Sequence, residues 1–177
     1  MKFTETRFGG VFVIDLERHE DQRGFFARSF CAKEFAACGL PVGFVQCNIS
    51  YNHRRGTLRG MHYQAMPYAE GKLVRATRGL IHDVVLDLRP SSATYCDWLF
   101  FDLSDEEGRA LYIPPGFAHG FQTLTDHAEV FYQMTESYVA GLARGVRWDD
   151  PAFAIKWPIL PPLLSERDAS FPDFEAS

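Results

Sequence analysis

The order of hydrophobic and polar residues predicts a chain built mainly from short strands. Runs in which apolar residues alternate with polar ones recur at intervals of about 8–12 residues and are separated by Gly, Pro, Asp or Ser. This pattern is typical of an all-β sandwich or barrel. The strands are expected within residues 9–16, 25–30, 44–50, 56–64, 72–79, 80–89, 97–104, 109–115, 119–125 and 128–135.

Other segments complete the predicted topology. Residues 31–40, CAKEFAACGL, space their apolar positions near the helical period, and Gly39 ends the run, which predicts a helix. DQRG at 21–24 has the chemistry of a turn. Residues 80–89 are too apolar for strict alternation, so this strand is expected at the centre of a sheet. The tail, 149–177, holds five prolines and is expected to wrap the barrel and end in a short helix near LLSERD.

Length, composition and charge fit one globular domain over residues 1–177. The 46% hydrophobic content is enough for a core, and no linker or repeat interrupts the chain. The net charge of −5 comes without a basic block, which predicts no nucleic-acid partner, although clustered arginines can still hold a phosphate. No apolar run suits a signal peptide or membrane span, so no membrane partner is expected. The four cysteines form no C-x-x-C pair, which predicts free thiols in a reducing cytoplasm.

Ionisable groups are unusually dense along the strand-like run GTLRGMHYQ and the loop after it. Since side chains alternate across a strand, His62 is expected to share a face with Gly60 and Gln64, and Arg59 to point to the opposite face. If His62 points inward, the barrel holds a polar pocket rather than a sealed core, and such interiors are common ligand sites.

A second informative stretch is GRALYIPPGFAHGF, residues 108–121, which has the form G-x5-P-x-G-x2-H and ends at His119. It resembles the second motif of cupins, which are double-stranded β-helix barrels. The first cupin motif contains H-x-H followed by Glu, and here His62 is followed by Gln64 and then Glu70. One hypothesis is therefore a metal held by His62, Glu70 and His119, as iron or manganese can be.

The competing hypothesis is acid–base chemistry without a metal. His62 is a natural base near neutral pH, and Tyr132 is a candidate acid on a late strand. Lys72 could stabilise a developing enolate, and Arg23 and Arg59 could hold phosphates. A lone His or Tyr on a strand is more often a satisfied polar group than a catalyst, and Lys72, Arg59 and Glu70 could be solvated charges, so the joint occurrence of these residues carries more weight than any one of them.

Taken together, the motifs resemble one known family, the dTDP-4-dehydrorhamnose 3,5-epimerases, over nearly the whole chain. The resemblance implies an all-β, cupin-type jelly-roll barrel with short peripheral helices and a wrapping C-terminal tail. It also implies a homodimer, no metal or other cofactor, and a nucleotide-linked 4-keto-6-deoxyhexose as substrate. The matching segments, in the family's order, are DQRGFFARSF, QCNIS, GTLRGMHYQ, EGKLVR, IHDVVLDLR, IPPGFAHGFQTL, EVFYQMTESY, GVRWDDPAFAIKWP and LSERD.

By this resemblance, four side chains carry the reaction. His62 matches the base that removes protons next to the C4 ketone, and Tyr132 matches the acid that returns a proton from the other face. Lys72 lies where the enolate is stabilised. Asp168 in LSERD matches the carboxylate paired with the base, with Asp83 as the alternative because the end of the chain is hard to align.

The resemblance assigns further residues to substrate binding. His119 matches a sugar contact and Arg59 a phosphate contact. Arg23 and Phe26 match residues that reach the region of the nucleotide base, partly from the neighbouring subunit, so N-terminal residues are expected to complete the neighbour's site. The remaining binding residues implied in this way are Gln46, Asn48, Arg28 and Tyr138.

Two positions depart from the family pattern on the nucleotide side. The family often has Glu where this chain has Arg28, and an acidic residue near the position of Ala143. A GDP- or CDP-linked sugar and an epimerase acting at one carbon therefore stay open. So do a ketoisomerase, a metal-dependent cupin oxygenase and a non-catalytic sugar-nucleotide binder, although a pure binder has little use for an opposed base and acid.

Overall fold

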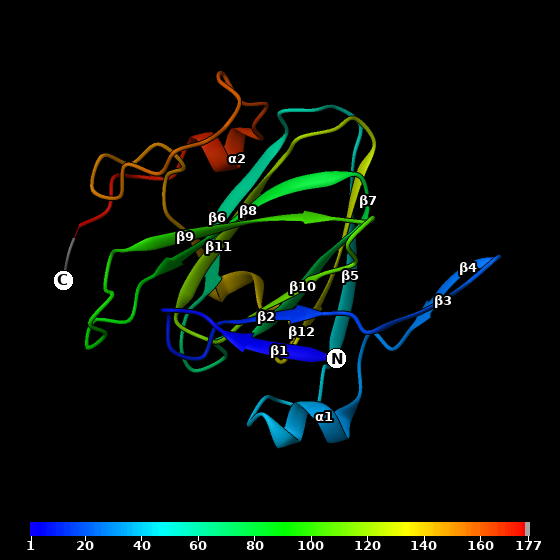
Figure 1. The fold of residues 1–177 in the computed structure, drawn as a ribbon. Helices are drawn as coiled ribbons and strands as arrows, with labels where there is room; N and C mark the ends of the chain where they lie inside the picture. Colours follow the sequence, from blue (N-terminus) through cyan, green and yellow to red (C-terminus); the bar gives the residue numbers. More distant parts are fainter. Residues whose placement is uncertain (176–177) are drawn as a thin grey trace.

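The computed structural model describes residues 1–175, and strands form most of its regular structure (Figure 1). This confirms the predicted all-β class. Within the described residues, no helix is long and apolar enough to cross a membrane. The elements are β1 (Lys2–Glu5), β2 (Phe12–Asp15), β3 (Arg18–Asp21), β4 (Gly24–Ala27), α1 (Ala32–Ala37), β5 (Gln46–Asn52), β6 (Leu58–Gln64), β7 (Lys72–Arg78), β8 (Leu80–Asp87), β9 (Trp98–Ser104), β10 (Ala110–Ile113), β11 (Phe117–Thr123), β12 (Ala128–Met134), the 3-10 helix η1 (Ala140–Leu142), β13 (Ala143–Gly145) and α2 (Glu166–Ala169).

Two antiparallel sheets form the body of the molecule. One has six strands in the order β1-β2-β10-β7-β12-β5, and the other has five in the order β13-β6-β11-β8-β9. In Figure 1, β8, β9 and β11 of the second sheet lie above β1, β2 and β10 of the first. Apolar side chains fill the space between the sheets, among them Val74, Val85, Leu111, Phe117 and Val130.

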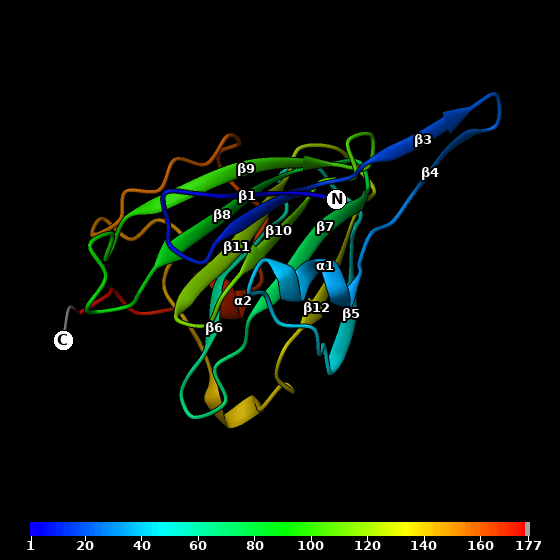
Figure 2. The same cartoon turned by 60° about the horizontal axis from the view of Figure 1, so that its bottom comes forward.

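Each sheet also has part of its outer face covered. The predicted helix forms as α1, and its Phe35 packs on Ile14 and Leu73 of the six-stranded sheet; Figure 2 shows α1 in front of that sheet. The C-terminal tail covers the five-stranded sheet with Phe153, Ile155 and Trp157, and the short helix predicted near LLSERD forms as α2. These segments bury part of each outer face, while Ile49 on β5 and Phe100 on β9 remain 65% and 52% exposed.

Strand β8 shows why its sequence is so apolar. It pairs with β11 on one side and β9 on the other, so the predicted central position is confirmed. Val85 belongs to the core between the sheets, whereas Val84 and Leu86 pack beneath the tail. Because both faces of this strand are buried, its sequence does not alternate strictly between apolar and polar residues.

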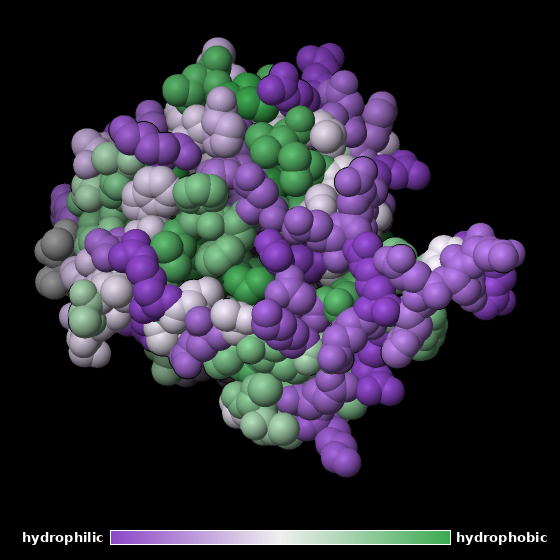
Figure 3. All heavy atoms as spheres, viewed as in Figure 1, coloured by the Kyte–Doolittle hydropathy of each residue, from purple (hydrophilic) through white to green (hydrophobic). Residues whose placement is uncertain are grey.

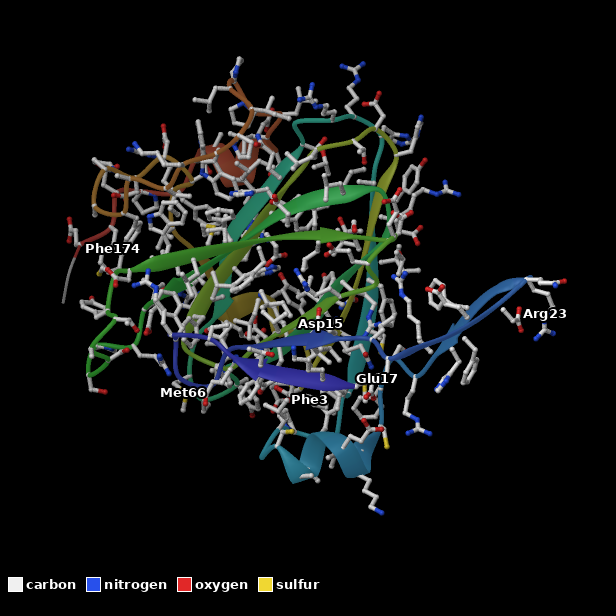
Figure 4. All side chains as sticks on the ribbon, in the orientation of Figure 1. Phe3, Asp15, Glu17, Arg23, Met66 and Phe174 are labelled. Carbon is white, nitrogen blue, oxygen red and sulfur yellow. The ribbon has the colours of Figure 1, made fainter. Side chains whose placement is uncertain are left out.

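The segment after the DQRG turn differs from its prediction. The expected strand over residues 25–30 is the shorter β4, which pairs only with β3 and joins neither sheet. The turn itself forms as predicted, with Asp21 opposite Gly24. This hairpin projects from the body, with Arg23 at its tip (Figure 4), and the projection is mostly hydrophilic on the face shown in Figure 3.

Candidate active site

A bulge in β6 turns two important side chains into the same cavity. His62 lies opposite His119 on β11, and Arg59 lies opposite Phe121, so three steps along β6 match two along β11. The extra residue is a β-bulge, which locally breaks the alternation of faces. The expectation that Arg59 points away from the face of His62 was therefore wrong, since both side chains line the cavity.

The structure pairs His62 with Asp168. His62 Nε2 lies 2.7 Å from Asp168 Oδ1, and the carboxylate is buried in α2, where Ser165 caps the helix by accepting from the Asp168 backbone N–H. Because a carboxylate only accepts, the Nε2–H of His62 donates to Asp168 in either protonation state of the ring, and Nδ1 has a free lone pair when the ring is neutral. Burial alone would raise the pKa of Asp168, but hydrogen bonding to His62 and the charge of that ring outweigh burial and hold the pKa below its usual value.

A second imidazole–carboxylate pair lies in the same wall of the cavity. His119 Nε2 is 2.8 Å from Asp83 Oδ2, and Asp83 is fully buried. Asp83 is thus engaged by His119, which separates the two carboxylates that the sequence left as alternatives for His62.

Tyr132 reaches the cavity from the opposite sheet. It lies on β12, between Asn48 on β5 and Val74 on β7. Burial raises the pKa of the Tyr132 phenol above its usual value, the positive charge of Arg59 opposes that rise, and the carboxylate of Glu70 adds to it. The phenol is therefore a neutral proton donor near pH 7, facing the cavity that His62 enters from the other side.

Lys72 forms a buried ion pair beside these groups. Its Nζ is 3.0 Å from Glu70 Oε1 and 3.4 Å from the His62 carbonyl oxygen. The side chains of Lys72 and Glu70 are only 12% and 5% exposed, so the pair is largely shielded from solvent. A fixed ammonium here can donate to an oxygen that becomes negative during reaction.

The cavity enclosed by these side chains has a volume of about 630 Å³, which suits a ligand larger than a single sugar. It brings together residues from β5, β6, β7, β11, β12 and α2 that are far apart in the sequence. The predicted site residues that line it are His62, Tyr132, Asp168, Lys72, Gln46, Asn48, Arg59, His119 and Tyr138.

The alternative metal ligand set is not assembled. His62 is bonded to Asp168, His119 to Asp83 and Glu70 to Lys72. Within residues 1–175, no group of three or more His, Cys, Asp or Glu side chains is close enough to hold a metal ion. Gln64, at the position of the second cupin histidine, instead uses its amide to hold the backbone of neighbouring loops at Tyr68, Ser137 and Val139.

Comparison with known proteins places this cavity in a family. The sequence model described as dTDP-4-dehydrorhamnose 3,5-epimerase matches residues 5–176. The chain belongs to the dTDP-4-dehydrorhamnose 3,5-epimerase family. It is 45% identical over 170 residues to the enzyme of that name from Pseudomonas aeruginosa, covering 95% of this chain and 93% of the relative. The resemblance stated from the motifs is thus confirmed.

Solved structures and a differently named relative widen the comparison. The crystal structure of the Bacillus anthracis epimerase with TDP and pyrophosphate bound matches with a TM-score of 0.95 and 40% identity, covering 98% of this chain and 99% of that one. A relative from Streptomyces niveus, named dTDP-4-dehydrorhamnose 3-epimerase, is 39% identical over 160 residues, covering 90% of this chain and 77% of its own. Both kinds of epimerase therefore share this chain's sequence pattern, and the chain is an isomerase of the epimerase class.

Three residues assigned to substrate binding from the epimerase resemblance lie outside this chain's cavity. Arg23 is 89% exposed and pairs with Asp21 at the tip of the hairpin, and Phe26 is 74% exposed on β4. Arg28 follows the hairpin and pairs with Glu34 of α1 at 2.7 Å. Within a single subunit these side chains do not meet the other site residues.

Sequence reasoning missed two arginines of the epimerase cavity. Arg144 lies on β13, directly after Ala143, and Arg167 lies on α2. Both arginines line the cavity. Each directly neighbours a residue that the motifs did single out, Ala143 and Asp168. The available signal was therefore their position next to those residues, since an isolated arginine is usually a solvated surface group.

Proposed function

We propose that this protein inverts C3 and C5 of a dTDP-linked 4-dehydro-6-deoxyglucose and so forms dTDP-4-dehydrorhamnose without a cofactor. The observation that carries the proposal is the placement of His62 and Tyr132 on opposite sheets around one cavity. Inversion requires a proton to leave one face of a carbon and return on the other, hence two different groups. C3 and C5 both flank the C4 carbonyl, so one oxyanion site can serve both carbons.

In the proposed step, His62 Nδ1 takes the proton from the carbon next to the ketone. The electron pair of the broken C–H bond forms the C=C bond of an enolate, and the carbonyl π pair moves onto the C4 oxygen, to which Lys72 donates a hydrogen bond. Tyr132 then gives its phenolic proton to the opposite face of the carbon, and the enolate collapses back to the ketone. The resulting imidazolium and phenolate return to their starting states by exchange with solvent.

Solvent deuterium tests this division of labour. Incubation in deuterated water should place deuterium at C3 and C5 of the sugar, read by mass, with inversion at both carbons. In Tyr132→Phe we expect exchange to continue while inversion is lost, since the base still works from its own face. In His62→Ala both should fall by at least about 100-fold, and full epimerisation by that variant would overturn the proposal.

We further propose that the protein acts as a homodimer in which the β3–β4 hairpin completes the neighbour's site. Phe25 and Phe26 are 49% and 74% exposed on a hairpin that pairs with neither sheet. A two-stranded hairpin is marginally stable alone in water, and exposed large rings are typical of interfaces. The placement of Arg23 far from the cavity of its own subunit fits a contact made in another subunit.

The proposal extends to the remaining features of the fold and its setting. Two facing antiparallel sheets around an internal cavity support a cupin-type jelly roll acting as one domain. All four cysteines are free thiols, which fits the cytoplasm.

A second candidate is inversion at one carbon only, because a relative named as a 3-epimerase is also 39% identical to this chain. Arg28 and Ala143 also leave the nucleotide open. A panel of dTDP-, GDP-, CDP- and UDP-linked 4-keto-6-deoxy sugars in deuterated water separates these possibilities. Deuterium at C3 alone would support the single-carbon reaction. Turnover of only a GDP-, CDP- or UDP-linked sugar would show that the substrate does not carry dTDP.

A further inference from the structure

One buried acid in the cavity has no part in the proposed steps. Glu70 precedes β7, its side chain is 5% exposed, and its Oε1 lies 3.0 Å from Lys72 Nζ. Its Oε2 is buried and has no hydrogen-bond partner among the described residues. A carboxylate in such a place is costly unless a specific interaction requires its charge, so the contact with Lys72 is the natural explanation for its position.

The geometry at Lys72 shows what Glu70 does. An ammonium group has three N–H donors in a tetrahedral arrangement on a flexible stem. One donor is directed to Glu70, and a second is directed to the His62 carbonyl oxygen at 3.4 Å. Two anchors fix the rotation of the group, which leaves the third donor aimed in one direction.

We propose that Glu70 is a positioning residue: with the His62 carbonyl, it holds the Lys72 ammonium so that one N–H is left for the developing oxyanion of the substrate. This inference rests on the proposed function, because it needs an oxygen that becomes negative during the reaction. It also explains how Lys72 can be placed in the cavity as part of a neutral pair rather than as an uncompensated buried cation.

The position of Glu70 has a second consequence that can be measured without substrate. Its negative charge adds to the effect of burial in raising the pKa of Tyr132, whereas Arg59 acts in the opposite direction. The titratable and charged groups that share the cavity wall with the phenol are Glu70, Lys72, Arg59, His62, His119, Asp168, Arg144, Arg167 and the tyrosines Tyr51, Tyr63 and Tyr138. Removing the Glu70 charge alone is therefore expected to lower the pKa of Tyr132.

A double-mutant cycle tests the positioning role. Glu70→Gln should lower kcat about 10- to 100-fold, with KM changed less than about threefold, because the aimed N–H acts on the transition state. In a Lys72→Met background the same change should have little further effect on kcat. Glu129→Gln is the matched control, since Glu129 lies on β12 outside the cavity and bonds to Thr77; it should leave kcat unchanged. Equal losses from Glu70→Gln in both backgrounds, or no loss in either, would overturn the inference.

Titration of the phenol by ultraviolet absorbance tests separately whether a charged Glu70 carboxylate lies beside Tyr132, while the split between kcat and KM is the readout that a merely structural role would not give. The signal of Tyr132 is the difference between each protein and its Tyr132→Phe counterpart. Glu70→Gln should shift that titration to lower pH and Glu129→Gln should not; an unmoved titration in Glu70→Gln would count against the inference. If the wild-type protein inverts its substrate but the losses of kcat from Glu70→Gln and Lys72→Met simply add, the positioning role of Glu70 is rejected and the proposed function stands. If the wild type binds the sugar nucleotide without deuterium exchange, the proposed function falls and this inference with it.

Discussion

At the scale of single residues, the cavity holds two imidazole–carboxylate pairs with similar geometry and different surroundings. His62–Asp168 spans 2.7 Å and His119–Asp83 spans 2.8 Å. The His62 side chain is 37% exposed to the cavity, whereas that of His119 is 10% exposed. Only the first ring is therefore well placed to exchange protons with a bound substrate and then with solvent.

This difference predicts unequal effects of removing the two carboxylates. Asp168→Asn should lower kcat for deuterium exchange by at least about 100-fold, because an amide does not hold the Nε2–H tautomer or stabilise the imidazolium. Asp83→Asn should instead raise KM while keeping kcat within about tenfold, since it acts on a proposed sugar contact. Steady-state exchange measured by mass spectrometry separates kcat from KM; a larger loss of kcat in Asp83→Asn would reverse the assignment of the base.

The sequence identified most of the cavity residues and, through the family resemblance, the pairing of His62 with Asp168, but not the pairings of His119 with Asp83 and of Glu70 with Lys72. Asp168 lies 106 positions after His62, and only the fold of the tail decides that it, rather than Asp83, meets that ring. The sequence suggested that Glu70 lies near the site, but only the structure shows that it pairs with Lys72. Pairing depends on side-chain directions at strand ends and loops, which hydrophobic periodicity does not encode.

At the scale of elements, the bulge in β6 decides which side chains enter the cavity. Gly60 has φ +142°, and a Cβ built on it would lie 2.5 Å from Gly120 Cα of the adjoining strand. A side chain at this position would therefore push β6 and β11 apart. The alternation rule failed at Arg59 for this reason, because a run of residues predicts strand faces only where the strand is regular.

Replacing that glycine should damage both stability and substrate binding. Gly60→Ala is expected to cost about 2–4 kcal/mol and to lower Tm by roughly 5–15 °C in a chain of this size. KM should also rise, since Arg59 loses its place. Gly43→Ala is the matched control, because a Cβ there meets nothing within 4 Å. Calorimetry gives Tm and steady-state kinetics give KM. A Gly60→Ala protein as stable as the Gly43→Ala control would show that the close approach of β6 and β11 does not require a glycine at position 60.

The projecting hairpin allows the proposed dimer to be tested by complementation. A His62→Ala subunit has an intact hairpin, and an Arg23→Glu, Phe26→Ala subunit has an intact base, so each homodimer should be nearly inactive. After subunits exchange in an equal mixture, half of the dimers are hybrids with one working site, which restores roughly a quarter of wild-type activity. Activity that does not recover after confirmed subunit exchange would mean that the hairpin serves its own subunit or none.

At the scale of the whole molecule, the order of the layers follows from which segments are apolar on both faces and must therefore be buried. The high apolar content of β8 predicted a central strand, and the proline-rich tail was predicted to lie on the outside of the barrel. The short β1, β3 and β13 were missed because their three or four residues are mostly polar, KFTE, RHED and ARG, and so show no apolar run or alternation. Which strands share a sheet also escaped the sequence, since that depends on long-range pairing such as β2 with β10.

Acid stability of the whole fold should depend on one buried carboxylate at the end of β8. Asp87 is fully buried, and although burial alone would raise its pKa, hydrogen bonds from Arg89, Ser92 and Thr94 hold it at about 2. Against the ordinary value of 3.8, this difference is equivalent to about 2 kcal/mol. Because the folded pKa is the lower one, the stabilisation is complete above about pH 4 and is lost as the pH falls towards 2.

The expected result is that Asp87→Asn lowers Tm by roughly 4–8 °C at pH 6, and that its difference from wild type narrows between pH 4 and 2. Glu34 provides the comparison, because its pKa is also about 2 but it pairs with Arg28 and the N-terminus at the surface. In 0.5 M salt, screening should remove the effect of Glu34→Gln and spare that of Asp87→Asn. Thermal unfolding across pH and salt measures both, and a salt-sensitive loss in Asp87→Asn would show that the buried network is not what resists acid.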